Sequence, residues 1–556
     1  MVDRATSADT PVLVVGAGPV GLSAAILLAR HGVKAHVVER HASTTNHPKS
    51  RAVLTRTMEI LRPWGVEGAL RAQALPPGAF RFIWIESLAG REIGRVEPPN
   101  RDVPGPNSPN YICMVAQDAF EAQLRHHAQT YPAIELSFGT ELIELDQDEH
   151  GVSVTLRDRR SGGLRTVRAA YVVAADGASS RVREALDVAM VGPGELDHNI
   201  NIHFRAELAP WVRARPAVGY ISSVGNGTLL WAHGTDRWLI LRAFEPARGE
   251  RPEHFTPERC LELARAAVGM PDLPVELINI AFWTRTAQVA QRFQVGRVFL
   301  AGDAAHRFPP TGGFGANTGI QDVHNLAWKL AAVVRGWAHP RLLETYEEER
   351  RPIAQANTDF SVTNGHRWAA AQQAILSGDE TALASALKEQ VKHLDSEGQD
   401  LGFCYASGAL VPDGARAPVP LDSQVYVPSA VPGARAPHVW LHPVNPSGGA
   451  GGPHLSTLDL FERQFVLLSG PRDETWRRAA QAAAQDLGIP LCVYAIGPGG
   501  DFQSRERDWA QLYELEALGA VLVRPDGHVA WRSRGQANDA LAQLRHALAA
   551  SSGRQT

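Results

Sequence analysis

Residues 11–39, PVLVVGAGPVGLSAAILLARHGVKAHVVE, contain the pattern that decides the fold. Pro11–Val15 is a continuous apolar run, as expected for a strand that is buried on both faces. A glycine-rich turn, GAGPVG, occupies residues 16–21 and leads into apolar residues at helical spacing. A second apolar run, Ala35–Val38, ends at Glu39. This order predicts a βαβ unit of about 30 residues.

The turn has the spacing of a dinucleotide-binding motif. Gly16 permits the tight turn, Gly18 lets the backbone approach a pyrophosphate, and Gly21 lets helix and strand pack closely. Pro19 begins the helix, whose N-terminus directs N–H groups and a positive dipole end toward phosphates. Glu39 is placed to accept hydrogen bonds from ribose hydroxyls and would repel a 2′-phosphate, which favours FAD or NAD. The alternative is a glycine-rich turn in an α/β core without a nucleotide.

Composition narrows the classes of function. The chain has 556 residues, of which 44% are hydrophobic and 21% charged, so we expect several globular domains. With 55 Lys and Arg against 59 Asp and Glu, the formal net charge is −4, which argues against a nucleic-acid partner. Four widely spaced cysteines without CxxC or zinc spacing predict a reduced cytoplasmic protein without a structural metal. The uncharged stretch Pro11–Ala29 is interrupted by glycine and proline, so we expect no membrane partner.

Two further segments place an aspartate beside a glycine after an apolar strand. Tyr171–Ala175 runs into Asp176-Gly177, and Val298–Ala301 runs into Gly302-Asp303. In open α/β sheets, ligands bind at such strand ends. The second segment continues into PPTGGFGANTG at residues 309–319 and a predicted helix at Ile320–Val334, which offers another helix N-terminus to an anionic group.

Together these three ordered motifs resemble the single-component, FAD-dependent aromatic hydroxylases, the group that includes p-hydroxybenzoate and phenol hydroxylases. The branch with 2,4-dichlorophenol and aromatic polyketide hydroxylases is the most similar. The resemblance implies FAD-binding roles for Gly16, Gly18, Pro19, Gly21, Glu39, Arg40, Arg51, Gln117, Asp176, Asp303, Pro310, Gly313, Gly315, Ala316 and Asn317. Arg51 would reach the FAD phosphates, Gln117 the FAD side chain and Asp303 the ribityl chain. Asp176, with Arg181, would serve both FAD and NAD(P)H.

The activity implied by the resemblance is hydroxylation of a phenolic or polycyclic aromatic compound with O2 and NADH or NADPH, through a C4a-hydroperoxyflavin. Two alternatives stay open: Baeyer–Villiger or epoxidising chemistry on an aromatic polyketide, and a flavoprotein that binds FAD and ligand without turnover. The sequence does not choose between NADH and NADPH, identify the aromatic substrate, or give the oligomeric state, a homodimer included.

The residue that makes the substrate a phenolate is not evident from the sequence. His47 lies in a turn-like segment, while His203, Arg205 and Arg242 lie on alternating strands where one face can meet a pocket. These four are our candidates for contact with substrate. Trp231, Trp238 and Trp283 lie on similar strands. For each of them, simple packing or solvent exposure is the more common role of such a residue.

We predict an α/β fold with the following division. Residues 1–185 form the first part of a Rossmann-like FAD-binding domain, and 186–285 form an inserted antiparallel-sheet domain that binds substrate. Residues 286–400 complete the FAD-binding domain and add solvent-facing helices, and 401–429 form a linker. Residues 430–556 show the order β-α-β-β-β-α of a thioredoxin-like domain; without CxxC, Cys492 is expected to be redox-silent there.

Overall fold

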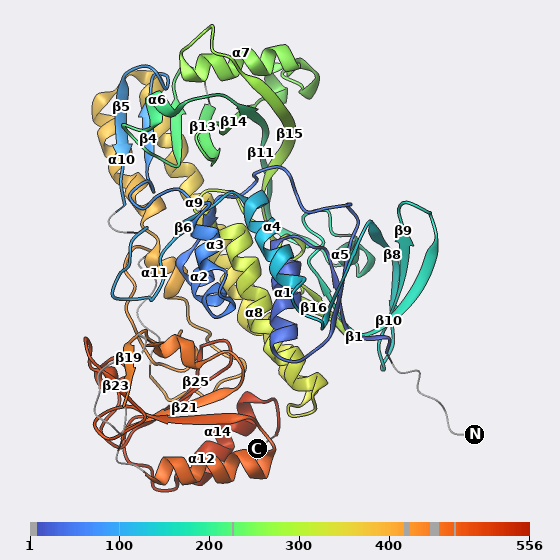
Figure 1. Ribbon diagram of the computed structural model, residues 1–556, viewed down its shortest axis with the longest axis vertical. Helices are drawn as coiled ribbons and strands as arrows, with labels where there is room; N and C mark the ends of the chain where they lie inside the picture. The colour runs from blue at the N-terminus through green and yellow to red at the C-terminus, as the bar shows by residue number, and fades with distance from the viewer. Residues whose placement is uncertain are drawn as a thin grey trace.

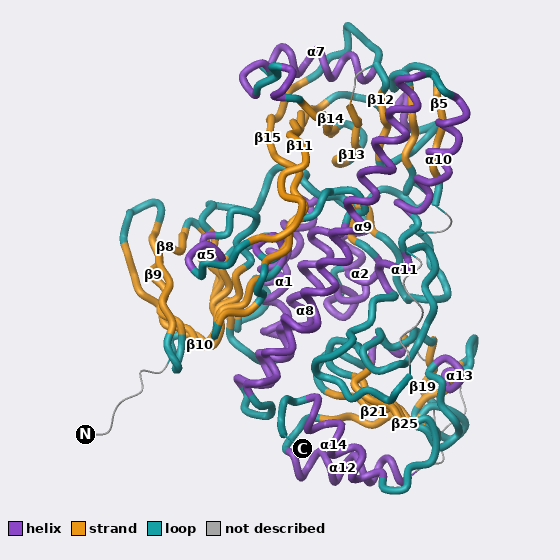
Figure 2. The backbone as a smooth tube through the Cα atoms, turned by 180° about the vertical axis from the view of Figure 1, so that it is seen from behind, coloured by secondary structure: helices purple, strands orange, loops and turns teal. Residues whose placement is uncertain are grey.

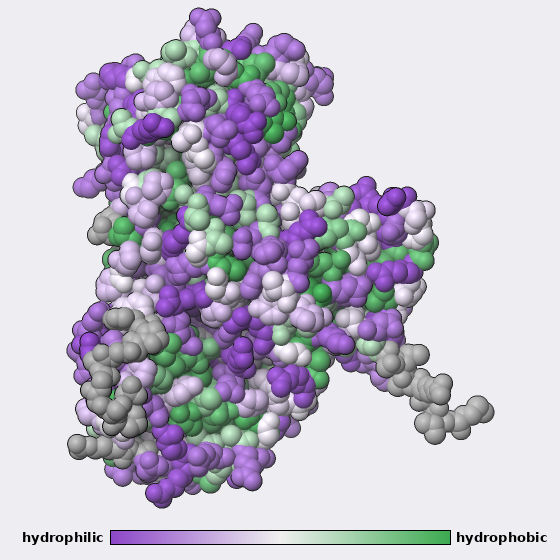
Figure 3. Space-filling view, in the orientation of Figure 1, coloured by the Kyte–Doolittle hydropathy of each residue, from purple (hydrophilic) through white to green (hydrophobic). Residues whose placement is uncertain are grey.

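The structure is a computed structural model that describes residues 8–98, 101–224, 227–415, 423–444, 455–471 and 474–555. Figure 1 shows three regions: a first sheet with its helices in the middle, a second sheet above it, and the C-terminal region below. Polar and apolar residues are interspersed on the face drawn in Figure 3. Within the described ranges no helix is long and apolar enough to cross a bilayer.

The first sheet confirms the predicted βαβ unit. β1 (Thr10–Val15) pairs in parallel with β2 (Ala35–Glu39) and with β10 (Leu164–Ala174), and β10 pairs in parallel with β17 (Val298–Leu300). The carboxyl ends of the three predicted ligand-binding strands therefore meet at one edge. The outer strands of this sheet are β16 (Gln294–Val295) and β7 (Ile134–Phe138). The antiparallel pair β8 (Thr140–Gln147) and β9 (Val152–Asp158) extends from β10.

Steric limits explain the glycines of the first turn. Gly16 has φ +103°, and a Cβ there would lie 2.3 Å from the carbonyl oxygen of Ala175. A Cβ on Gly21 would lie 1.9 Å from the carbonyl oxygen of Gly16, so only glycine lets α1 (Pro19–Arg30) pack against this turn. A Cβ on Gly18 would meet nothing within 4 Å, because this position faces open space.

Two long helices cover the first sheet beside α1 (Figure 2). α8 (Phe314–Val334) begins in the glycine-rich loop after β17, and α9 (Thr345–Ser377) starts beside it and continues up to the second sheet. The remaining helices of this region are short: α2 (Thr55–Leu61), α3 (Glu67–Arg71), α4 (Gln117–Ala128) and α5 (Arg181–Ala185).

The second sheet contains the expected antiparallel strands and three more from outside residues 186–285. Its order is β18 (His306–Arg307), β15 (Glu276–Ala290), β11 (Met190–Arg205), β14 (Arg237–Phe244), β13 (Gly227–His233), β12 (Gly219–Ser222), β4 (Phe82–Ile85) and β5 (Glu92–Val96). β4 and β5 come from the segment that we assigned to the first sheet, and β4 pairs with β12 in parallel. Such a pairing across more than 100 residues of chain leaves no mark in local periodicity. α7 (Pro257–Val268) and α6 (Ala209–Val212) complete this region.

Residues 340–400 are helical as predicted, yet they are not merely solvent-facing. α10 (Glu380–Leu394) packs against β5, and α11 (Glu397–Leu401) follows it. Trp368 of α9 and Leu394 of α10 join an apolar cluster with Trp84 of β4. These helices thus close one side of the second sheet.

The C-terminal region has a mixed sheet in the order β22 (Leu491–Ala495), β21 (Phe465–Ser469), β24 (Ala520–Val523) and β25 (Val529–Ser533). α12 (Glu474–Leu487) and α14 (Ala540–Ser551) pack together on it. These four strands and two helices follow the predicted order, but a short strand and a short helix lie between β22 and β24. Its core continues into α8, where the rings of Trp328 and Phe465 lie 5.8 Å apart. The smaller elements are β19 (Trp440–Pro443), β20 (Leu455–Ser456), β23 (Phe502–Ser504) and α13 (Trp509–Leu512).

The first part of the expected linker, 401–429, packs against the rest of the molecule. Phe403, Tyr405 and Leu410 are buried near its start, whereas Val425 and Val427 near its end are exposed. The proline and glycine content of this segment had predicted a loose linker. Its aromatic side chains instead pack into the neighbouring core. Residues 416–422 and nearly all of the glycine-rich segment VNPSGGAGGP lie outside the described residues.

Candidate active site

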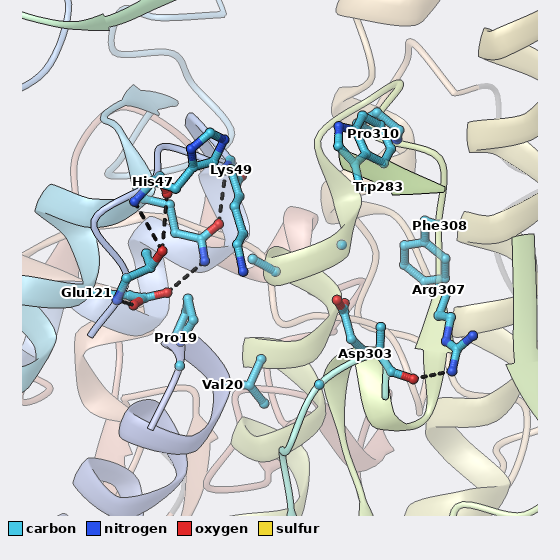
Figure 4. Close-up of a pocket in the computed structure, with 18 of the residues that line it drawn as sticks. Pro19, Val20, His47, Lys49, Glu121, Trp283, Asp303, Arg307, Phe308 and Pro310 are labelled. Carbon is cyan, nitrogen blue, oxygen red and sulfur yellow. Dashed lines mark hydrogen bonds between the residues drawn. The ribbon is translucent and has the colours of Figure 1, made fainter. Parts of the chain in front are cut away.

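A cavity of about 1260 Å³ lies where the carboxyl ends of the parallel strands face the second sheet (Figure 4). Strand ends Val15, Ala175 and Ala301 line one side, and Leu239 and Ala281 of the second sheet line another. Single-ligand pockets usually measure roughly 300–1,000 Å³. This cavity therefore has room for a dinucleotide and a second molecule.

The glycine-rich turn and the start of α1 form one end of the cavity. Gly16, Gly18 and Pro19 line it, and no side chain caps the N-terminus of α1, so the first N–H groups of the helix are free to bind an anion. Glu39 lies beside them: its Oε2 accepts a hydrogen bond from the N–H of Ala17 at 2.9 Å. Arg40 also lines the cavity, whereas Gly21 has only the packing role described above.

Asp303 follows β17 and lines the cavity, where its side chain is accessible to a ligand. It accepts no hydrogen bond from any described residue, and burial raises the pKa of its carboxyl, although His306, Lys49 and Arg307 act to lower it. Figure 4 shows Asp303 and the side chain of Lys49 pointing into the same space from opposite walls. An unpartnered carboxylate in such a place is suited to accept hydrogen bonds from ligand hydroxyls.

A fully buried polar cluster centred on Asp322 fixes the turn that contains Asp303. Asp322 of α8 accepts hydrogen bonds from the N–H of Gly302 at 3.2 Å and from Nε of Arg350 at 2.9 Å. Nε2 of His306 lies 2.6 Å from Asp322, and its ring stacks on Phe308. Burial acts to raise the pKa of the Asp322 carboxyl, but the neighbouring His306 and Arg350 hold it below its usual range. His306 is therefore structural.

The loop before α8 forms the floor of the cavity. Pro310, Gly313, Gly315 and Ala316 line it, and the N-terminus of α8 has no side-chain cap. Asn317 does not reach the cavity: its side chain accepts the N–H of Leu54 at 2.9 Å and donates to the carbonyl oxygens of Ala52 and Gly313. It fixes the loop to the neighbouring strand.

Arg51, Gln117 and Asp176 line the cavity but already have protein partners. Arg51 donates from Nε to the carbonyl oxygen of Trp231 at 2.7 Å, and burial lowers its pKa to about 10. Gln117 accepts the N–H of Ser50 at 3.0 Å. Asp176 accepts hydrogen bonds from Ser180 and the N–H of Val182, while burial raises its pKa. Arg181, at the rim, pairs with Glu141 at 2.6 Å.

A chain of hydrogen bonds holds Trp283, another residue of the cavity wall, in place. The indole Nε1 of Trp283 donates to Oδ1 of Asn201 at 3.0 Å, and Nδ2 of Asn201 donates to Nε2 of His47 at 3.2 Å. Nδ1 of His47 then donates to Oδ1 of Asn279 at 2.7 Å. Because an indole can only donate, every later donor and acceptor is determined, and His47 is neutral. Its lowered pKa, caused mainly by burial, agrees.

The other three candidates for substrate contact lie outside the cavity. His203 is covered by His47 and Arg237, and burial lowers its pKa to about 4. Arg205 is at the surface with Asp236 and Glu276, and Arg242 pairs with Glu250. Of the strand tryptophans, Trp283 lines the cavity, while Trp231 and Trp238 are packed in the second sheet's core.

The end of the cavity away from α1 contains residues that sequence analysis did not single out. They are Phe80, Phe82, Trp368, His393, Leu394 and Ser396. No spacing rule connects these positions in the chain, because β4, α9 and α10 meet only in the tertiary structure. Over the described ranges, no group of three or more His, Cys, Asp or Glu could hold a metal ion.

Two protein families match the chain. The family described as FAD binding domain matches residues 9–361. The family described as aromatic-ring hydroxylase, C-terminal, matches residues 429–554. Together they extend over most of the sequence.

Named relatives and solved structures match over nearly the whole length. Tetracenomycin A2 monooxygenase-dioxygenase of Streptomyces glaucescens is 38% identical and covers 97% of this chain and 96% of its own. The 2,4-dichlorophenol 6-monooxygenase of Delftia acidovorans is 34% identical and covers 99% of both chains. The flavin-dependent monooxygenase PieE, solved in complex with FAD and substrate, has a TM-score of 0.91 at 34% identity, over 98% of this chain and 99% of that one.

Proposed function

The chain belongs to the FAD-dependent aromatic-ring hydroxylases, and we propose that it adds one oxygen atom of O2 to a phenolic polycyclic aromatic compound, using NAD(P)H. The resemblance drawn from the three motifs is thereby confirmed. FAD is its cofactor, and NAD(P)H is the usual co-substrate of the family. The observation that supports the proposal best is a single cavity with an anion-binding end, a carboxylate and an aromatic end.

The residues of the cavity fit FAD. A Cβ on Gly18 would project into open space next to an uncapped helix N-terminus, which suits a pyrophosphate lying against the backbone. The unpartnered carboxylate of Asp303 suits a polyhydroxylated chain. A second uncapped helix N-terminus, that of α8, suits the electron-rich edge of a flavin ring.

In this assignment, Glu39 holds the ribose, Asp303 the ribityl chain, and the backbone of residues 313–316 the pyrimidine edge of the ring system. Arg51 and Gln117 hold the loop around Pro48 and Ser50 in shape, and we assign this loop to the adenosine diphosphate part of FAD. Once bound and reduced, FAD supplies the activation of O2. The protein's own part is to keep the site dry, orient the aromatic ring and place the positive end of α8 where negative charge develops.

His47 does not act as the phenolate base in this proposal. Its Nε2 accepts a hydrogen bond from Asn201 and its Nδ1 donates to Asn279, so neither nitrogen is free for substrate. We assign it instead to positioning, through Asn201, the indole of Trp283, which lines the cavity (Figure 4). Asp176 and Arg181, at the rim of the same cavity, are assigned to the approach of NAD(P)H.

The division of labour among the regions is also a proposal. The first sheet with α1 and α8 binds FAD, the second sheet covers the substrate, and the C-terminal region is a redox-silent, thioredoxin-like support. The cytoplasmic location and a homodimer remain predictions from the sequence.

Turnover assays test the proposal. FAD-loaded enzyme should oxidise NADH or NADPH and consume O2 in the presence of a polycyclic phenol, and the product should gain one oxygen as a ring hydroxyl. Mass spectrometry combined with NMR separates this product from a lactone or an epoxide, which would instead support the Baeyer–Villiger or epoxidising alternative. An FAD-replete protein that binds phenols but oxidises no NAD(P)H would contradict the proposal and support a non-catalytic flavoprotein.

A further inference from the structure

Three aromatic rings from distant parts of the chain form the far end of the cavity. The rings of Phe82 and His393 lie 6.4 Å apart and nearly parallel, at 19°. Trp368 meets both edge-on, with its centroid 5.4 Å from Phe82 and 6.0 Å from His393. All three side chains line the cavity. Flat surfaces of this kind bind the faces and edges of other aromatic rings.

An apolar wall connects this end with the floor beside Pro310. Phe80 and Phe82 pack into one cluster with Phe308 and Phe314, and into another with Trp368. The wall is therefore continuous from the start of α8 to α10. A ligand of several fused rings can lie along it and bury most of its surface.

Two side chains that line this end, His393 and Ser396, have a polar atom without a partner among the described residues. Nδ1 of His393 donates to Oε1 of Gln390 at 3.2 Å, which leaves Nε2 of the neutral ring as an acceptor without a partner among the described residues. His393 is only 6% exposed, and burial, with the nearby Arg367, lowers its pKa to about 4. Ser396 lines the cavity and precedes α11 in the N-cap position, yet its hydroxyl makes no capping bond.

The unpaired Nε2 of His393 and the hydroxyl of Ser396 determine which polar groups a ligand should carry at this end. A buried hydrogen-bonding atom without a partner is costly, so a ligand that satisfies it gains affinity. A neutral imidazole nitrogen that only accepts is complemented by a hydroxyl, which donates, and is mismatched to a carboxylate. Ser396 can donate to, or accept from, an oxygen on the same ring.

We infer that Phe82, Trp368, His393 and Ser396 form a distal-ring subsite for a hydroxylated terminal ring of a fused polycyclic substrate, with the ring hydroxyl donating to Nε2 of His393. This inference rests on the proposed function, because it names the end of the substrate that lies away from the flavin. His393 is a specificity-determining residue in this scheme. It does not take part in oxygen transfer.

Ligand titrations of the full-length, FAD-loaded protein without NAD(P)H test the subsite. The probes are 2,6-dihydroxyanthraquinone, which carries a hydroxyl at each end, and 2-hydroxyanthraquinone, which carries one. Wild type should bind the dihydroxy compound about five- to tenfold more tightly, as expected for one added hydrogen bond. In His393→Phe, which keeps an aromatic ring in place, the ratio of the two dissociation constants should fall to about one.

Controls make the result specific. His366→Phe, an exposed position on α9 outside the cavity lining, should keep the wild-type ratio. Ser396→Ala, a small change at the same end, should lower the ratio in part. A His393→Phe protein with an unchanged ratio, or a wild type that binds neither probe, would overturn the subsite. The titration involves no turnover, so its outcome is independent of the oxygenase assay. The subsite can be supported even if no hydroxylation is detected, and it can be disproved even if the enzyme hydroxylates single-ring phenols.

Discussion

Arg524 and Glu349 form a bidentate ion pair that is completely enclosed. Nη1 and Nη2 of the arginine lie 2.8 Å from Oε1 and Oε2 of the glutamate, and neither side chain has any exposed surface. Arg524 follows β24 of the C-terminal region, whereas Glu349 lies on α9. Lys329 of α8 binds the same carboxylate at 2.8 Å. The C-terminal region is therefore tied to the two helices that carry the cavity floor.

Arg524→Met should strongly destabilise the protein. The variant leaves Glu349 and Asp526 in a buried site without their main counter-charge, and loss of one partner of a buried pair costs about 3–5 kcal/mol. Thermal unfolding should show a large drop in Tm. The matched control is Arg477→Met, which breaks the partly exposed pair with Asp501 and should cost at most about 1 kcal/mol. Equal drops in the two variants would show that the enclosed pair has no special role.

Asp303→Ala should purify largely without its yellow cofactor. The substitution removes the unpartnered carboxylate that we assign to the ribityl chain, and the ratio of flavin to protein absorbance measures the loss. Asp359→Ala, at an exposed position of α9, should retain stoichiometric FAD. If Asp303→Ala keeps its FAD, the assignment is wrong.

Asp400 should make stability depend on pH between about 4 and 6. Burial raises the pKa of its carboxyl from 3.8 to about 6, and one of its oxygens has no hydrogen-bond partner. The folded state therefore binds the Asp400 proton more tightly than the unfolded state does. The contribution of this protonation to the free energy of unfolding is complete below pH 3.8 and is lost as the pH rises through about 6. The loss amounts to at most about 3 kcal/mol, at 1.36 kcal/mol per pKa unit.

Asp400→Asn is the corresponding test. The neutral amide removes the cost of a buried charge, so the variant should melt above wild type at pH 8 and close to it at pH 4.5. A Tm difference that does not change between the two pH values would mean that Asp400 is ionised throughout.

Cys492→Ser should leave turnover unchanged. Cys492 lies half-buried on β22 beside the Gln464 amide, and all four cysteines are free thiols. Disulfide exchange needs a partner thiol, and none is bonded to it. A hydroxyl in a partly apolar site costs on the order of 1 kcal/mol, which would appear in Tm and not in kcat. Reduced kcat in a folded, FAD-replete variant would assign the C-terminal region a part in the chemistry.

The sequence alone determined the parts of the fold that depend on local rules. The turn at residues 16–21 needs glycine for steric reasons that hold in any context, and the strand ends at Asp176 and Asp303 follow continuous apolar runs. Most of the residues predicted to bind FAD line the cavity; Gly21 and Asn317 instead hold the turn and the loop in shape. The strands and helices of 465–551, apart from β23 and α13, were predictable for the same local reason.

The tertiary structure alone decided the substrate end of the cavity. An alternating pattern shows that Asn201 and His203 share one face of β11, but not that Asn201 lines the cavity while His203 lies under Arg237. Trp368 and His393 belong to helices whose sequence is typical of solvated surfaces. They reach the cavity only because β4 joins the second sheet from 137 residues away (Phe82 opposite Gly219) and α9 and α10 pack beside it. Contacts between segments so far apart depend on the packing of whole elements, which local periodicity does not encode.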